Sequence, residues 1–165
     1  MNRVLTYILR FAVILIGYMV ATLAASAFIQ LLFLGSAGLR LGEAWELVTG
    51  SLLFSVPFTA LFVGYFAFLP AVVLIVAGEV LGQRNWLFYA LAGAAVGLAV
   101  AVLFWQSSMM ADGMGQMNTD PAFSGPRFVG LMIGGGIVGG LAYWLCAGRS
   151  AGNWRVAAKP TSPER

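Results

Sequence analysis

The chain has 165 residues, of which 61% are hydrophobic and 9% are charged. Soluble domains average about 25% charged residues, so this composition excludes an ordinary soluble protein and favours one embedded in a membrane. The sequence has no histidine and a single cysteine, Cys146. Histidine-based haem and metal sites, histidine general bases and cysteine-pair redox chemistry are therefore excluded within the chain, and Cys146 is interpreted as a small apolar residue.

Four long segments without a charged residue follow one another along the chain: Phe11–Leu34, Leu52–Ala77, Leu87–Trp105 and Phe128–Ala147. About twenty helical residues, each rising about 1.5 Å, cross a hydrocarbon core of roughly 30 Å. These segments lack the alternation of a membrane β-barrel, so backbone hydrogen bonding in lipid requires helices. We predict an all-α membrane protein with four transmembrane helices in an up-down bundle, forming one domain over residues 1–155. A disordered cytoplasmic tail is expected at residues 156–165.

The first apolar segment has two interpretations. Arg3 and Arg10 precede it, and the stretch Ala24–Ala27 offers a small-residue cleavage pattern like that of a secretory signal. However, the apolar run continues through Phe33, beyond the typical signal length of about 7–15 residues. We therefore expect a retained helix, with cleavage as the alternative. The long side chain of Arg10 is expected to snorkel to the membrane interface.

The basic residues predict the orientation. Seven of them share the side of the N-terminus: Arg3, Arg10, Arg84, Arg149, Arg155, Lys159 and Arg165. Arg40 and Arg127 fall on the other side. From this bias we predict that both termini lie in the cytoplasm. The membrane is expected to be a bacterial-type inner membrane. All five tryptophans lie near predicted span ends, at headgroup level: Trp45, Trp86, Trp105, Trp144 and Trp154.

The segment between the first two spans has a helical pattern. Leu41, Ala44, Trp45 and Val48 recur at helical spacing. The pattern predicts a short amphipathic helix on the outer surface or an outward extension of the second helix. A loop with chance periodicity is the alternative.

Few polar residues occur within or beside the spans. Glu79, just past the second span, is the nearest candidate for a proton-coupling carboxylate, although an interfacial charge is the favoured interpretation. The hydroxyl residues within the spans, such as Thr22 and Ser26, are expected to bond back to their own helix.

Small residues recur four positions apart in the third and fourth spans. The predicted helix-packing residues are Gly93, Gly97, Gly130, Gly134, Gly135, Gly136, Gly139 and Gly140. Such spacing makes a flat stripe on which two helix backbones approach closely in lipid. Leucine at Gly136 and Gly140 is expected to push the helices apart, and alanine to be better tolerated.

The segment between the last two spans, Gln106–Arg127, contains four methionines: Met109, Met110, Met114 and Met117. Thioethers suit Cu(I), so these residues form a candidate metal site. The alternative is a loop whose methionines dip into the membrane interface.

The fourth span is followed by Arg149 and Arg155, with Trp154 between them. Arg149 and the adjacent glycines are interpreted as helix stop signals. Arg149 and Arg155 are also a candidate site for an anionic lipid headgroup.

No nucleophile–base pair and no metal cluster is visible, so we predict a protein that is not an enzyme and needs no cofactor. Because the basic residues lie beside spans, a nucleic-acid partner is not expected. The predicted partners are membrane lipids and either a second copy of the chain or another membrane protein. The predicted function is therefore that of a multi-pass membrane protein acting through helix–helix packing, as a homo-oligomer or accessory subunit. A small-solute channel or transporter, or a Cu(I) binder, is the alternative.

Overall fold

The computed structural model describes residues 3–36, 45–112 and 126–151. These residues form α1 (Arg3–Ser36), α2 (Trp45–Leu81), α3 (Trp86–Asp112), α4 (Pro126–Cys146) and the short 3₁₀ helix η2 (Gly148–Ser150). Four segments are long and apolar enough to cross a membrane: Tyr7–Phe33, Leu52–Leu81, Trp86–Gln106 and Pro126–Cys146. The prediction of an all-helical chain with four such helices is confirmed for the described residues, as expected for a multi-pass membrane protein.

The helices are longer than the apolar segments that predicted them. α1 begins before Arg10, which therefore lies inside a helix. α2 begins at Trp45, so the described part of the first outer segment is an extension of this helix. α3 continues to Asp112, which places the start of the predicted methionine-containing loop in helix. Neither glycine nor proline interrupts the chain between Gln106 and Asp112, so the helix continues beyond the apolar run.

The turn between α2 and α3 is specified by local sequence. Gly82 has a φ of +64°, the left-handed conformation that glycine adopts without steric cost. The Gln83 amide donates to the Gly78 carbonyl (3.0 Å), and the Gly82 amide donates to the Glu79 carbonyl (3.3 Å). These two bonds form a Schellman motif that ends α2. Asn85 then caps α3, because its side-chain oxygen accepts the amide of Leu87 at 3.0 Å.

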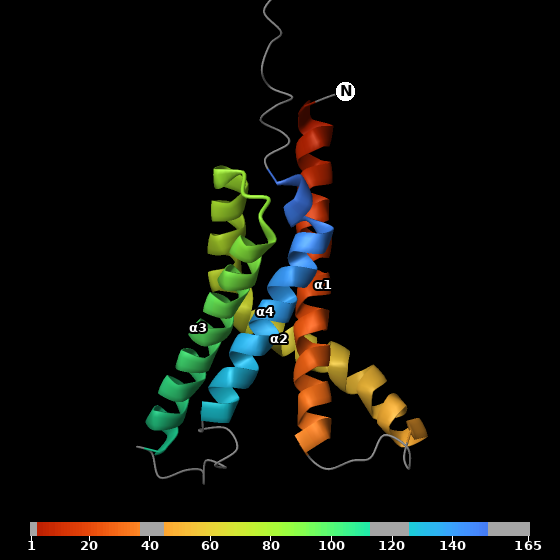
Figure 1. Ribbon diagram of the computed structural model, residues 1–165, viewed down its shortest axis with the longest axis vertical. Helices are drawn as coiled ribbons and strands as arrows, with labels where there is room; N and C mark the ends of the chain where they lie inside the picture. Colours follow the sequence, from red (N-terminus) through yellow and green to blue (C-terminus); the bar gives the residue numbers. More distant parts are fainter. Residues whose placement is uncertain (1–2, 37–44, 113–125, 152–165) are drawn as a thin grey trace, which may run out of the picture.

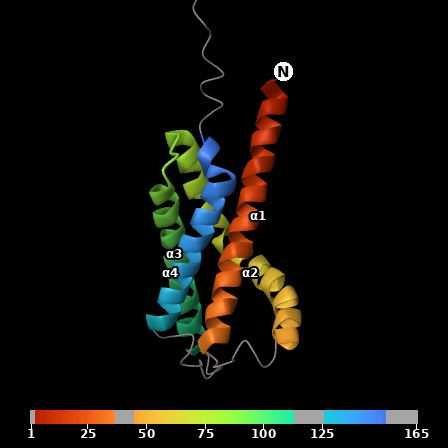
Figure 2. The ribbon, with the colours of Figure 1, turned by 45° about the vertical axis from the view of Figure 1, so that its right-hand side comes forward.

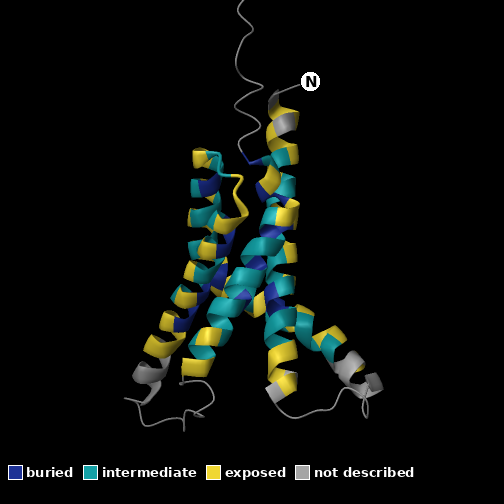
Figure 3. Ribbon diagram, viewed as in Figure 1, coloured by how far each residue is buried: buried dark blue, intermediate teal, exposed yellow. Residues whose placement is uncertain are grey.

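α4 is the central helix of the bundle. It lies between α3 and α1 in Figure 1, and its interfaces with these two helices are the most extensive in the structure. α2 crosses behind α4 and packs mainly against α1 (Figures 1 and 2). Buried residues follow the inner faces of the helices, and exposed residues follow the outer faces (Figure 3). The fold is therefore a layer of three helices with α2 added beside α1.

The backbones of α3 and α4 touch where the two helices cross. A Cβ atom built on Gly93 would overlap the carbonyl oxygen of Gly136, and one built on Gly136 would overlap that of Gly93. A Cβ on Gly140 would overlap the carbonyl oxygen of Tyr89. Even one methyl group is therefore too large at these positions, so alanine as well as leucine is expected to disturb this crossing.

The predicted packing glycines are divided between two neighbours of α4. Gly93, Gly97, Gly136 and Gly140 lie between α3 and α4, whereas Gly134, Gly135 and Gly139 face α1. A Cβ on Gly139 would lie 3.1 Å from the carbonyl oxygen of Ala21. Gly130 differs, because a Cβ there would meet nothing within 4 Å. All but one of these glycines are thus occupied by contacts within the chain.

We expect Gly136→Ala to lower the thermal stability of the purified protein in detergent. The added methyl overlaps backbone, and overpacking of this kind costs about 1–3 kcal/mol. Gly130→Ala, in the open part of the same helix, is the matched control and should be neutral or slightly stabilising, since alanine favours helix. Equal melting temperatures for Gly136→Ala and the unchanged protein would rule out backbone contact at this crossing.

Candidate functional site

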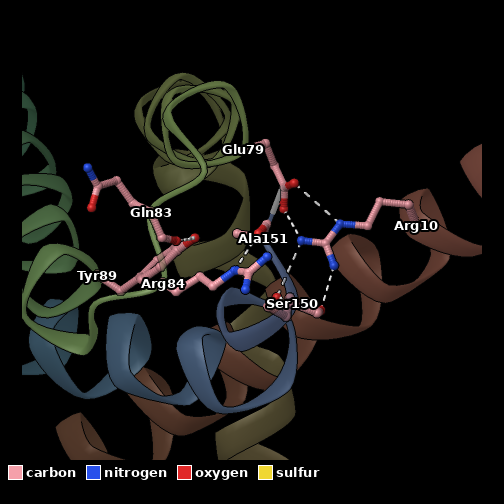
Figure 4. Close-up of polar contacts among 8 residues, drawn as sticks. Arg10, Glu79, Gln83, Arg84, Tyr89, Ser150 and Ala151 are labelled. Carbon is pink, nitrogen blue, oxygen red and sulfur yellow. Dashed lines mark hydrogen bonds and ion pairs between the residues drawn. The ribbon is translucent and has the colours of Figure 1, made fainter. Parts of the chain in front are cut away.

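A charged pair joins α1 to α2 at one end of the bundle. Nη2 of Arg10 forms an ion pair with Oε1 of Glu79, and Nε of Arg10 donates to Oε2 of Glu79 at 3.3 Å. Both side chains are largely buried, with exposed fractions of 16% for Arg10 and 13% for Glu79. The planar guanidinium therefore contacts both carboxylate oxygens in a bidentate arrangement, the strongest geometry available to such a pair (Figure 4).

Arg10 also binds the segment that follows α4. Its Nη1 donates to the Ser150 hydroxyl at 2.6 Å, and its Nη2 donates to the Ala147 carbonyl at 3.4 Å. The Ser150 hydroxyl in turn donates to the Ala147 carbonyl at 3.1 Å. At this end of the bundle the side chain of Arg10 points between the helices and connects three segments that are distant in sequence. Its position relative to a membrane interface stays a prediction.

The position of Glu79 explains why it needs a cation. Glu79 lies in the last turn of α2, where the helix dipole is negative and a carboxylate is disfavoured. The Schellman motif at Gly82 fixes this helix end and therefore the place of the carboxylate. Arg10 supplies the opposite charge from α1, and low dielectric at the end of a membrane span strengthens the attraction.

Further polar contacts fasten the α2–α3 turn to the end of α4. Arg84 donates through Nε to the carbonyl of Ala151 at 3.0 Å, and Trp144 donates through Nε1 to the carbonyl of Arg84 at 2.8 Å. The hydroxyl of Tyr89 donates to the carbonyl of Gln83 at 3.1 Å. With the Arg10–Glu79 pair, these contacts form a polar network, which we call the Arg10 network. Figure 4 shows its contacts other than that of Trp144.

Polar side chains also link α1 to α2 deeper in the spans. Tyr18 donates to the carbonyl of Gly64 at 2.5 Å, and Ser26 donates to the carbonyl of Val56 at 2.7 Å. The side-chain amide of Gln30 donates to the hydroxyl of Thr59 at 2.8 Å. The expectation that hydroxyls bond to their own helix is wrong for Ser26.

Thr22 behaves as that expectation requires, because its hydroxyl donates to the carbonyl of Met19, one turn earlier in α1, at 2.9 Å. The hydroxyls of Thr22 and Ser26 thus differ in their acceptor, which lies on α1 for Thr22 and on α2 for Ser26.

The candidate metal and lipid residues lie only partly within the described residues, so these two sites stay predictions. Met109 and Met110 lie in the last turns of α3, and Met114 and Met117 lie outside the described residues. In the described ranges, no group of three or more His, Cys, Asp or Glu side chains could hold a metal ion. The guanidinium of Arg149 stacks over the Trp144 ring, 4.7 Å from its centroid, and Arg155 lies outside the described residues.

The Arg10 network holds helix ends together and presents no arrangement of nucleophile and base. Sequence inspection could have found part of it, because glycine and asparagine on either side of Gln83 and Arg84 mark the turn that carries it. The pairing of Arg10 with Glu79 had no local signal, since the residues are far apart in the chain.

No family model, curated protein or solved structure matches this chain.

We expect Arg10→Gln and Glu79→Gln each to destabilise the protein, because either change leaves the other charge buried and unpaired. Residual exposure puts the expected loss at about 2–3 kcal/mol, below that of a fully buried pair. The double variant should lose clearly less than the sum of the single losses, measured by unfolding in mixed detergent micelles. Arg127→Gln, an exposed change in the first turn of α4, serves as the control. Strictly additive losses would show that the two side chains do not interact.

Proposed function

We propose that this chain is a small, non-enzymatic membrane protein that acts through contacts between its own helices and those of a partner. The partner is a second copy of the chain or another subunit of a membrane complex. The glycine-rich faces of α3 and α4 are already occupied within the chain. A partner would therefore contact a different surface, and α2 offers one.

The outer face of α2 carries a continuous row of large exposed side chains, which we call the α2 ridge: Phe54, Phe58, Leu61, Tyr65, Leu69, Val73, Val76 and Val80. Successive members of the ridge lie three or four residues apart, the spacing that places side chains on one face of a helix where a second helix can pack against them. The exposed fraction reaches 83% at Phe54 and 76% at Leu69.

Tyr65 is the observation that carries the proposal. It lies near the middle of the Leu52–Leu81 span and is 78% exposed. Tyrosine in membrane proteins is ordinarily enriched at the interfaces, where its hydroxyl is hydrated. At mid-span the Tyr65 hydroxyl makes no hydrogen bond to another described residue and would face hydrocarbon, which is costly. A partner helix with a polar group opposite Tyr65 would remove that cost.

We expect cysteines placed on the ridge to form cross-links in native membranes. Cys146→Ser gives a cysteine-free background, because Cys146 is the only cysteine in the chain. Leu61→Cys and Leu69→Cys, one turn on either side of Tyr65, should then cross-link with a short bis-maleimide, whereas Met19→Cys on the exposed face of α1 should not. A product of twice the chain mass identifies a homodimer, and a different mass identifies a subunit complex.

The variant Tyr65→Phe distinguishes whether the Tyr65 hydroxyl contacts a partner or faces lipid. If the hydroxyl meets a partner, its removal should lower the cross-linking yield of Leu61→Cys. If it faces lipid, removal should leave the yield unchanged and should not destabilise the protein. Absence of ridge cross-links, or equal cross-linking from Met19→Cys, would contradict the proposal.

We further propose that the bundle crosses a bacterial-type inner membrane in up-down fashion with both termini in the cytoplasm. The seven-to-two distribution of basic residues supports this orientation. Reporter fusions at Gln83 and after Arg165 should be active in the cytoplasm, and fusions at Gly42 and Asp120 should be active outside. If the reporter fused after Arg165 is found outside the cell, the proposed orientation is contradicted.

A channel or transporter for a small solute is the second candidate. The observation in its favour is the largely buried Arg10–Glu79 pair, since charged groups within spans often mark solute or proton pathways. Against it, the other polar side chains between α1 and α2 bond to one another or to backbone and do not line a continuous path.

A further inference from the structure

A half-open cavity of about 120 Å³ lies where the four helices converge. Its wall is almost entirely apolar and contains many small residues, among them Ala67 and Ala71 of α2 and Gly93 and Gly97 of α3. An apolar cavity of about 150 Å³ in another protein stays dry and binds a molecule as small as benzene. By size and lining, this cavity suits a small apolar molecule better than a group of waters.

Three tyrosines line the cavity, and their hydroxyl groups differ. Those of Tyr18 and Tyr89 donate to backbone carbonyls, at 2.5 and 3.1 Å respectively. Tyr143 is 4% exposed, and its hydroxyl is buried without a hydrogen-bond partner among the described residues. Tyr143 is among the residues that line the cavity, and a buried hydroxyl without a partner is unfavourable, so a ligand whose polar atom reaches this hydroxyl from the cavity would be bound selectively.

The position of α2 offers a way into the cavity from the membrane. α2 forms one wall, through residues such as Ala67 and Leu74, yet it contacts α3 and α4 much less than it contacts α1. Between α2 and α3 a solute dissolved in the bilayer would have to displace few contacts. Entry from lipid also agrees with the apolar character of the wall.

We propose that this cavity binds a small, mostly apolar molecule that partitions into the membrane and carries one hydrogen-bonding polar atom, recognised by the Tyr143 hydroxyl. The helices form a cavity of fixed size around the apolar part of the molecule, and the Tyr143 hydroxyl makes the single directional contact with it. This site lies on the inner side of α2 and is separate from the α2 ridge on its outer side. It adds a ligand-binding role to the proposed packing function and does not depend on it.

Two matched probes test the site on the full chain in phosphatidylcholine nanodiscs. 4-Fluorobenzyl alcohol carries a hydroxyl and 4-fluorotoluene does not, and ¹⁹F NMR measures the binding of each against empty nanodiscs. One ordinary net hydrogen bond corresponds to about fivefold in affinity, so the alcohol should bind about fivefold more tightly after correction for partitioning.

Variants assign this preference to one atom. Tyr143→Phe should abolish the preference while leaving 4-fluorotoluene binding intact. Tyr18→Phe is the matched control, since the Tyr18 hydroxyl is already bonded to Gly64, and the fivefold preference should persist. Ala67→Leu should fill the cavity and weaken both probes. Ala71→Leu does the same from the next turn if Ala67→Leu fails to fold.

Several results would overturn the proposal. Binding of neither probe above the empty nanodiscs would show that the cavity does not accept such a ligand. Equal binding of the two probes would mean that the Tyr143 hydroxyl is served by water or another group. A preference that survives Tyr143→Phe would place the polar contact elsewhere.

Discussion

Backbone contact between α3 and α4 is the constraint on which the rest of the structure depends. Lipid tails solvate apolar side chains as well as another helix does, so helices in a membrane associate through close van der Waals contact. Gly93 and Gly136 provide it by allowing each backbone to reach the carbonyl of the other. Because Gly139 brings α1 close on an adjacent face, α4 is held between two helices. α2 is left to attach by other means.

Those means are polar. Hydrogen bonds from Ser26 and Gln30 join α1 to α2 within the spans, and the pair of Arg10 and Glu79 joins them at one end. In a medium of low dielectric an unpaired group is costly, so each such contact favours one arrangement of the two helices strongly. The bundle thus combines two kinds of association, dispersion between glycine faces and polar bonds between α1 and α2. The network that contains Arg10 also secures the α2–α3 turn and the chain after α4.

The two faces of α2 explain why the proposals concern the same helix. Its inner face carries alanines, such as Ala67, that leave a cavity between the helices. Its outer face carries large side chains, with Tyr65 at mid-span. A helix that made extensive contacts with the whole bundle would leave neither feature. The limited contact of α2 with α3 and α4 is therefore the common origin of the inner cavity and the free outer ridge.

The sequence by itself determined the existence of four membrane-spanning helices, because length and apolarity leave the backbone no other way to satisfy its hydrogen bonds in lipid. It also carried the signals for the α2–α3 turn, where Gly82 and Asn85 act on their immediate neighbours, and for glycine stripes at four-residue spacing. Only the tertiary structure decided that Arg10 turns inward to Glu79, and that Tyr18 faces the bundle whereas Tyr65 faces outward. In a soluble helix, polarity marks the outer face; in a span that is apolar on every side, that signal is missing. Which face meets which neighbour then depends on contacts between residues far apart in the chain.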